Sequence, residues 1–383
     1  MLRPRITHLV AAVLVLSGAA AACSGTSGDD VRVSKGDGTS PTSSAEQAGA
    51  DSSSTAPSTT RPPTGSGKPV TLAFAGDVNF QNQVAAVVAS PSTVLSAIAP
   101  SLSSADVTMV NLEAALGTGG SPQGKTFTFQ VPEQALTALQ AAGVDAVTMA
   151  NNHGMDYGMA GFQDSLRIKG SSGFPILGIG ADEAQAYTPW ITEVNGQRIG
   201  FLAANDVFDD ALRSAWTAGP GTPGLASAEE AHQERLAQAV KDARPQVDTL
   251  VVFLHYGTEK QTCPNPRQQE LVTLLTQAGA DIVVGSHPHR LQGVGYLGDK
   301  FVAYSLGNFA FKANSPDGSA TGVLVVTATG QRIDGYEWKP AVIRNSIPYP
   351  VTGAAADAAQ ATMTQRQACA GLTPTAGATG APG

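Results

Sequence analysis

The sequence contains six histidines, and four of them closely follow apolar, strand-like runs. These four are His153, His255, His287 and His289, and the acidic residues Asp77 and Glu113 stand in the same position after runs of their own. With the carboxamide of Asn152, these imidazoles and carboxylates form a donor set of borderline to hard character, which suits zinc, manganese or iron. The pattern predicts a site for one or two divalent metals, with the choice among the three metals left open.

The segment His287-Pro288-His289 places two imidazoles one residue apart. The loop that carries them is expected to bend between the two residues. Pro288 stiffens such a bend because its ring fixes one backbone dihedral. The two histidines are therefore expected to serve two neighbouring metals, or one metal and the substrate.

The elements that position these residues are predicted from apolar runs and helical periodicity. Strands are expected at 70–75, 107–111, 146–149, 198–203, 249–254, 282–285, 300–305 and 322–326, and helices at 133–142, 161–169, 228–243 and 266–278. This alternation indicates an α/β (α+β) fold. In open α/β sheets ligands bind beyond the carboxyl ends of the strands, so the six candidate residues are expected to converge on one crevice.

The composition allows a core and excludes one class of partner. Hydrophobic residues make up 42% of the 383 residues, and the formal net charge is −8. A chain with this balance lacks the global positive field that holds nucleic acid, although a local basic patch remains compatible with it. We therefore predict no nucleic-acid partner.

Residues 1–22 have the pattern of a lipoprotein signal peptide, with a basic start, an apolar run and small residues before Cys23. The segment Ala20-Ala21-Ala22-Cys23 resembles the bacterial lipobox, with Ala20 where leucine is usual. The expectation is lipidation of Cys23 and anchoring on the outer face of the cell membrane. The alternatives are an ordinary cleaved signal with an incidental Cys23, and partial release of the protein.

The remaining chain divides by composition. Residues 23–68 are rich in Ser, Thr, Pro and Gly, and we predict that they form a disordered tether. The folded domain is predicted at residues 69–350. A C-terminal helix or extension is predicted at 351–370, and a disordered tail at 371–383. Cys263 and Cys369 are the cysteines left over in an exported chain, and they predict one disulfide. Two buried free thiols are the alternative.

Six ordered motifs carry a resemblance to a known family. They are Phe74-Ala75-Gly76-Asp77-Val78, Asn111-Leu112-Glu113, Ala150-Asn151-Asn152-His153, His255-Tyr256-Gly257-Thr258-Glu259, Gly285-Ser286-His287-Pro288-His289 and Tyr304-Ser305-Leu306-Gly307-Asn308-Phe309. Over residues 69–349 the chain resembles the CapA-type poly-γ-glutamate capsule biosynthesis family, a branch of the calcineurin-like metallophosphoesterases. The resemblance implies a two-sheet β-sandwich flanked by helices, in four layers.

The resemblance also implies roles for single residues. Asp77 matches the first ligand Asp, Glu113 the bridging acid and Asn152 the ligand Asn, and the later ligand histidines correspond to His255, His287 and His289. His153 matches the histidine that protonates or stabilises the leaving oxygen. Two positions depart from the phosphoesterase pattern: Asn79 stands where histidine is usual, and Glu113 replaces Asp. A dinuclear centre therefore does not follow from the resemblance.

Further residues are expected around this centre. Glu259 is predicted to orient the imidazole of His255, with a solvated loop acid as the alternative. Asn79, Asp156, Arg290 and Asn308 are predicted at the substrate rim, where Arg290, like Arg267, would clamp an anionic group. For Asn308 a purely structural turn is an equal alternative.

Two functions follow from these expectations. The first is a metal-dependent hydrolase outside the membrane, acting on phosphoester or polymer bonds of the cell envelope. The second is a non-catalytic scaffold that binds or guides an anionic polymer such as poly-γ-glutamate during export. Both would work at the membrane, where a membrane ligase or export complex is the expected partner, and the chain has no segment that resembles an ATP-binding loop.

Overall fold

The computed structural model describes residues 67–377. The predicted signal peptide (1–22), the lipidation site Cys23, residues 24–66 of the predicted tether and the last six residues of the tail lie outside the described part of the chain. Within residues 67–377, none of the helices combines the length and the apolar character needed to cross a membrane.

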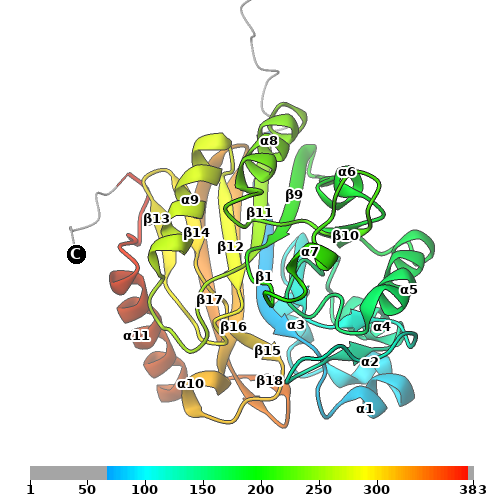
Figure 1. The fold of residues 1–383 in the computed structure, drawn as a ribbon. Helices are drawn as coiled ribbons and strands as arrows, with labels where there is room; N and C mark the ends of the chain where they lie inside the picture. The colour runs from blue at the N-terminus through cyan, green and yellow to red at the C-terminus, as the bar shows by residue number, and fades with distance from the viewer. Residues whose placement is uncertain (1–66, 378–383) are drawn as a thin grey trace, which may run out of the picture. The chain divides into compact units, whose positions relative to one another are not determined.

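Two β-sheets form the centre of the domain (Figure 1). The first has the order β18-β17-β16-β1-β2-β5-β6, with β15 also paired to β1. Its strands are β1 (Val70–Val78), β2 (Val107–Leu112), β5 (Ala146–Thr148), β6 (Ile176–Leu177), β15 (Asn308–Ala310), β16 (Ala320–Thr329), β17 (Arg332–Arg344) and β18 (Ile347–Pro350). β1, β2, β5 and β6 run parallel, whereas β16, β17 and β18 are antiparallel.

The second sheet has the order β13-β14-β12-β11-β9-β8. Its strands are β8 (Trp190–Val194), β9 (Gln197–Asn205), β11 (Thr249–His255), β12 (Ile282–Ser286), β13 (Val294–Leu297) and β14 (Lys300–Ala303). β9, β11, β12 and β14 are parallel. Two short ladders pair β3 (Ala115–Leu116) with β4 (Gln130–Val131), and β7 (Ile179–Gly180) with β10 (Gly224–Leu225).

Helices cover the outer faces of both sheets. The first sheet packs against α1 (Val84–Ala89), α2 (Pro91–Val94), α3 (Ala99–Leu102), α4 (Gln134–Ala141) and α5 (Gly158–Ser171), and the second against α8 (Gln233–Ala243) and α9 (Pro266–Ala278). Shorter elements are α6 (Glu183–Ala186), α7 (Arg213–Trp216), η1 (Arg244–Gln246) and α10 (Pro316–Ser319). One apolar core lies between the sheets and includes Phe74, Phe201 and Phe253. The predicted four-layer sandwich is confirmed.

Helix α9 shows how local sequence sets an element boundary. The Asn265 side chain accepts a hydrogen bond from the Gln268 backbone N–H at 2.8 Å, and the Gln268 side chain accepts one from the Asn265 N–H at 3.1 Å. Pro266 occupies the first helical position, where its missing N–H is not needed. Gly279 ends the helix with φ +124°, a conformation that favours glycine. The observed bounds match the predicted ones.

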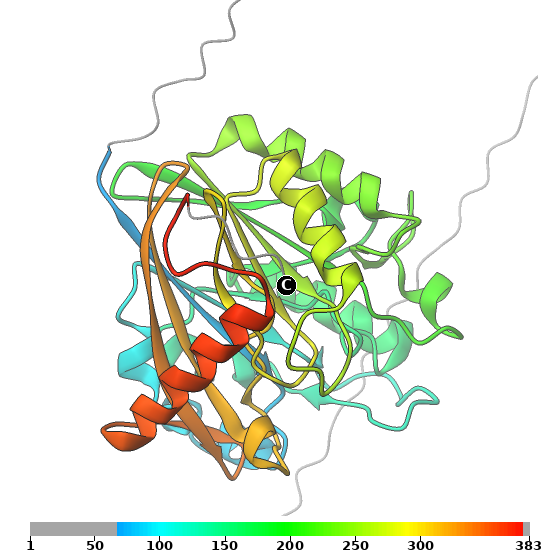
Figure 2. The same cartoon turned by 90° about the vertical axis from the view of Figure 1, so that its left-hand side faces the viewer.

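The C-terminal helix α11 (Ala354–Cys369) packs on β17 of one sheet and β13 of the other (Figure 2). Its last residue, Cys369, forms a disulfide with Cys263, and the two Cα atoms are 5.7 Å apart. The bond joins the end of α11 to the segment before α9. A cross-link that closes a loop of about a hundred residues can stabilise a protein by several kcal/mol through the unfolded chain.

The chain stays ordered beyond the point predicted. Leu372 is 5% exposed and belongs to the core of the second sheet, and Thr373 exchanges backbone hydrogen bonds with Tyr296 at 2.8 and 3.0 Å. The prediction of a disordered tail from residue 371 is therefore wrong for these residues. Composition did not predict the buried side chain of Leu372 or the backbone bridge of Thr373, because the residues around them are small and polar.

Candidate metal centre

The predicted ligands converge because the two sheets present their parallel strand ends to the same place. Asp77 lies at the end of β1, beside Asn111 at the end of β2, and His255 lies at the end of β11, beside Ser286 of β12. Glu113 and His287 follow directly after β2 and β12, and Asn152 and His289 lie in the loops after β5 and β12. The expectation that these residues share one crevice agrees with the geometry. Their roles as ligands stay predictions.

Glu113 lies at the centre of the group. It is fully buried, and its Oε1 is 3.7 Å from His255 Nε2 and 3.8 Å from the Nε2 atoms of both His153 and His289. Neither carboxylate oxygen has a hydrogen-bond partner among residues 67–377. An ionised carboxylate buried without partners is strongly unfavourable. A cation among these nitrogens would satisfy it.

Two further donor atoms lie close to His255 Nε2. His255 Nε2 lies 2.8 Å from Asn152 Oδ1 and 3.2 Å from His287 Nδ1. Ligand atoms of Glu113, His287 and His289 all lie within 4.8 Å of one another. Imidazole nitrogens and amide or carboxylate oxygens this close together form a set that suits zinc, manganese or iron.

Asp77 and His289 form the other side of the centre. Asp77 Oδ2 is 3.2 Å from His289 Nδ1 and has no hydrogen-bond partner in the described part of the chain. His289 Nδ1 also lies 2.8 Å from Asn308 Oδ1, while Asn308 Nδ2 donates to the Gly318 carbonyl at 2.9 Å. Asn308 therefore holds the His289 ring so that Nε2 faces Glu113. Ligating histidines commonly depend on such a partner at the other ring nitrogen.

The backbone of His287-Pro288-His289 bends as the sequence predicts. His287 has φ +98° and His289 has φ +52°, both in a region of backbone conformation that residues other than glycine rarely adopt. The two rings are brought to a centroid distance of 5.8 Å. Strain of this kind costs on the order of 1–3 kcal/mol per residue and concentrates at functional sites.

Burial and charge set the protonation of the imidazoles. Burial lowers the pKa of His255 well below its usual value and that of His287 to about 3, so both rings are neutral and keep a lone pair for a metal. Burial acts in the same direction on His289, but the carboxylates of Glu113 and Asp77 outweigh it and raise its pKa to about 9. Burial, followed by the charge of Asp77, raises the pKa of Glu113 well above its usual value. Metal binding at these groups would therefore release protons.

Asp156 is not at the rim, where the sequence analysis placed it. It is fully buried, and its Oδ2 lies 2.5 Å from His153 Nδ1 and accepts a hydrogen bond from the Phe129 N–H at 2.7 Å. Its Oδ1 is 2.8 Å from Lys125 Nζ, which also contacts the Asn152 carbonyl. The turn after His153 folds Asp156 inward, so Asp156 orients the His153 ring.

Glu259 does not contact His255 as predicted. His255 Nδ1 lies 3.2 Å from both Asn111 Nδ2 and Ser286 Oγ, which hold the ring instead. Glu259 is exposed, because the chain turns away from β11 at Gly257, which has φ +101°. From its place at the rim its charge raises the pKa of His289.

Asn79 is also buried rather than exposed at a rim, with only 2% of its surface accessible. Its Oδ1 accepts a hydrogen bond from the Gln81 N–H at 3.0 Å, and its Nδ2 has no partner among residues 67–377. The tight turn after β1 explains the burial, since Asn79 and Phe80 both donate backbone hydrogen bonds to the Ala310 carbonyl.

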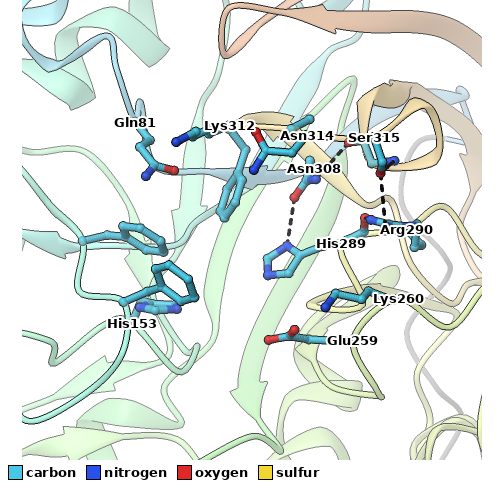
Figure 3. Close-up of a pocket in the computed structure, with 15 residues that line it drawn as sticks. Gln81, His153, Glu259, Lys260, His289, Arg290, Asn308, Lys312, Asn314 and Ser315 are labelled. Atoms are coloured by element: carbon cyan, nitrogen blue, oxygen red, sulfur yellow. Dashed lines mark hydrogen bonds between the residues drawn. The ribbon is translucent and has the colours of Figure 1, made fainter.

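A cleft of about 430 Å³ opens directly onto the centre (Figure 3). His153, His289 and Asn308 line its inner part, and the cations Lys260, Arg290 and Lys312 surround it. Arg290 lies in the lining of the cleft and donates hydrogen bonds to the His289 carbonyl at 2.7 Å and to Ser315 Oγ at 3.2 Å. Arg267, the other predicted clamp, pairs instead with Asp206 and Glu270.

Several residues of the site escaped prediction. Asn111 donates to Asp77 Oδ1 at 2.8 Å and accepts from Asn151 Nδ2 at 2.9 Å, so it links the strand ends. Its place in the motif Asn111-Leu112-Glu113, at a strand end, was a usable signal. Lys125, Lys260 and Lys312 lie in loops, and no periodicity or spacing marks them.

Comparison with known proteins assigns the family. Residues 71–313 match the family described as bacterial capsule synthesis protein PGA_cap. The chain belongs to this family. The predicted CapA-type family is thereby confirmed, and all six candidate ligands of the metal centre lie in motifs quoted for it above, with Asp77 in the first.

Two relatives from Bacillus are similar over part of the chain. The PGA biosynthesis protein CapA of Bacillus subtilis (strain 168) is 29% identical over 228 residues, which cover 59% of this chain and 58% of that protein. The capsule biosynthesis protein CapA of Bacillus anthracis is 28% identical over 249 residues, 63% of this chain and 60% of that protein. The match thus spans about three fifths of each relative.

Among solved structures, a putative 5'-nucleotidase from Staphylococcus aureus in complex with alpha-ketoglutarate has a TM-score of 0.47 and 15% identity. The likeness covers 78% of this chain and 58% of that one.

Proposed function

We propose that this chain is a metal-dependent hydrolase that acts on phosphoester or polymer bonds of an anionic cell-envelope polymer, in the context of poly-γ-glutamate capsule synthesis. The observation that carries the proposal is the buried carboxylate of Glu113, which has no hydrogen-bond partner among residues 67–377 and faces three imidazole Nε2 atoms at the bottom of a cation-lined cleft. The relatives' names supply the polymer context.

Six side chains would hold the metal: Asp77, Glu113, Asn152, His255, His287 and His289. A bound divalent metal supplies Lewis-acid polarisation of a phosphoryl or carbonyl oxygen and a water that is nucleophilic at neutral pH. The donor set fits one metal on the side of Asn152 and His255. Asn79, with Oδ1 already engaged by the Gln81 N–H, adds little to a second position beside Asp77.

The chain's own residues would do the rest. His153 would protonate the leaving oxygen, because Asp156 fixes its Nδ1 and turns Nε2 toward Glu113. Lys260, Arg290 and Lys312 would offset the negative charge of the substrate. Phe129 packs on the His153 ring at 4.4 Å between centroids and Phe311 on His289 at 4.8 Å, which keeps water from the inner faces of both rings.

The test is hydrolysis of bis(p-nitrophenyl) phosphate and of poly-γ-glutamate by the full chain with added manganese, zinc or iron. His153→Ala is expected to lower kcat by about 100-fold or more while the bound metal is unchanged, since general acid catalysis contributes on the order of 10²–10⁴-fold. The control His232→Ala changes the histidine that directly precedes α8, outside the centre, and should leave kcat unchanged.

Metal-loaded protein that binds poly-γ-glutamate but cleaves neither probe would contradict the hydrolase and favour the alternative of a non-catalytic scaffold that guides the polymer. Retained hydrolysis in His153→Ala would contradict the role of His153 alone.

We also propose that the chain works outside the membrane, anchored through lipid on Cys23, because the first residues have the signal and lipobox pattern. Labelled palmitate is expected to enter the wild-type protein and not Cys23→Ala. Equal labelling of both, or of neither, would contradict the anchor.

A further inference from the structure

A second cavity adjoins the cleft at the metal centre. It measures about 410 Å³ and shares three lining residues with the cleft: Gln81, Phe127 and Phe129. The two cavities therefore lie on either side of one short wall, within reach of a single extended ligand.

The two cavities differ in chemistry. The cleft is lined by Lys260, Arg290 and Lys312 against the single carboxylate of Glu259 (Figure 3). Lys260 and Lys312 have no ion-pair partner within residues 67–377, although the protein as a whole carries a formal charge of −8. Free cations in an acidic protein mark a place for an anionic group.

The second cavity has no charged residue in its described lining. Amides and hydroxyls line it, from Asn79, Gln81, Asn82, Thr126, Thr128, Gln130 and Tyr157. Asn79 is only 2% exposed, and its Nδ2 has no hydrogen-bond partner in the described part of the chain. A buried amide donor left unpaired is unfavourable, and a ligand acceptor would satisfy it. This cavity suits a neutral, hydrogen-bonding unit.

Phe127 stands at the wall between the cavities and is 64% exposed. The chain on either side of it is fixed: Lys125 pairs with Asp156 at 2.8 Å, and the Phe129 N–H donates to the same carboxylate at 2.7 Å. Because Lys125 and Phe129 fix the chain on both sides of Phe127, the exposed ring offers a face on which a ligand can pack.

We propose that the ligand of this site is an extended chain that occupies both cavities and crosses Phe127, with an anionic group in the cationic cleft and a neutral main-chain amide in the second cavity. The inference rests on the proposed function for the position of the reacting bond. A chain whose repeating unit combines a carboxylate with a main-chain amide has the required chemistry.

The experiment compares binding of a long and a short synthetic γ-linked oligoglutamate to the full chain by calorimetry, with inorganic phosphate as a third probe. The long oligomer is expected to bind more tightly than the short one. Phe127→Ala should lower the affinity for the long oligomer by about threefold to tenfold, the usual effect of losing an aromatic contact, and leave the affinity for phosphate unchanged.

A second variant tests the neutral cavity without removing a packed side chain. Thr126→Glu places a negative charge there and should weaken only the long oligomer, whereas the control Ser121→Glu, on the same exposed loop and outside both linings, should change nothing. Equal affinity of wild-type protein for the two oligomers, or a length preference untouched by Phe127→Ala and Thr126→Glu, would overturn the inference.

The outcomes separate this inference from the proposed function. Length-dependent binding without hydrolysis of any probe would contradict the proposed hydrolase activity and support the two cavities as a polymer-binding groove. Hydrolysis of bis(p-nitrophenyl) phosphate with no length preference for oligoglutamate would support the hydrolase activity and contradict binding across both cavities.

Discussion

Glu113→Gln is expected to abolish the stabilisation that added metal gives the protein, without destabilising the metal-free form. A ligand at a thousandfold excess over its Kd stabilises the folded state by about 4 kcal/mol. Most of that should vanish in the variant, because Glu113 Oε1 is the oxygen that faces His153, His255 and His289. In the metal-free protein the substitution removes a buried carboxyl that has no hydrogen-bond partner within residues 67–377, so the free energy of unfolding should not fall.

The measurement is thermal unfolding of the wild type and the variant, each with and without manganese or zinc. Glu259→Gln is the matched control, since it removes an exposed carboxylate at the rim of the same cleft and should retain most of the metal-induced shift. A Glu113→Gln protein that is less stable without metal and still gains the full shift would show that Glu113 is structural.

Lys125→Met is expected to lower the free energy of unfolding by about 3–5 kcal/mol, the usual effect of leaving a buried charge without its partner. The Lys125 side chain is 6% exposed, and its Nζ lies 2.8 Å from Asp156 Oδ1 and 3.2 Å from Asp209 Oδ2. Asp156 is fully buried, so the loss would strand its carboxylate beside His153. The rate of hydrolysis should fall as well, because His153 would lose its fixed orientation.

Denaturant unfolding of Lys125→Met, Asp156→Asn and the double variant forms a cycle that isolates the pair. The double variant is expected to recover part of the stability, since it removes both charges. Lys339→Met serves as the control: it breaks a pair with the exposed Glu337 and should cost about 1 kcal/mol or less. Additive losses in the cycle would show that Lys125 and Asp156 do not act together.

The convergence of the metal centre was predictable because it depends on strand ends. Asp77, His255 and the His287 loop follow long apolar runs, and the rule that parallel strands present their carboxyl ends together needs no side-chain detail. The bend at His287 was expected from the same segment, where Pro288 fixes one backbone dihedral between the two histidines.

The loop residues could not be placed in this way. Asp156 was expected at the rim, but it is buried in contact with Lys125, a residue thirty-one positions earlier in the chain that no local pattern links to it. Glu259 was assigned to His255 by spacing, but the turn at Gly257 directs it elsewhere. Strand β17 was missed because charged residues alternate with its buried Ile333, Trp338 and Ile343, and the register shifts at Thr327/Ala328 of its partner.

Elemental analysis of the full chain, purified without chelator beside His255→Ala and His287→Ala, tests the metal centre most directly. We expect zinc, manganese or iron near one or two equivalents in the wild type and a large loss in both variants, because each removes a nitrogen from the group around Glu113. Wild-type protein that stays folded without metal and takes up none on titration would contradict this expectation.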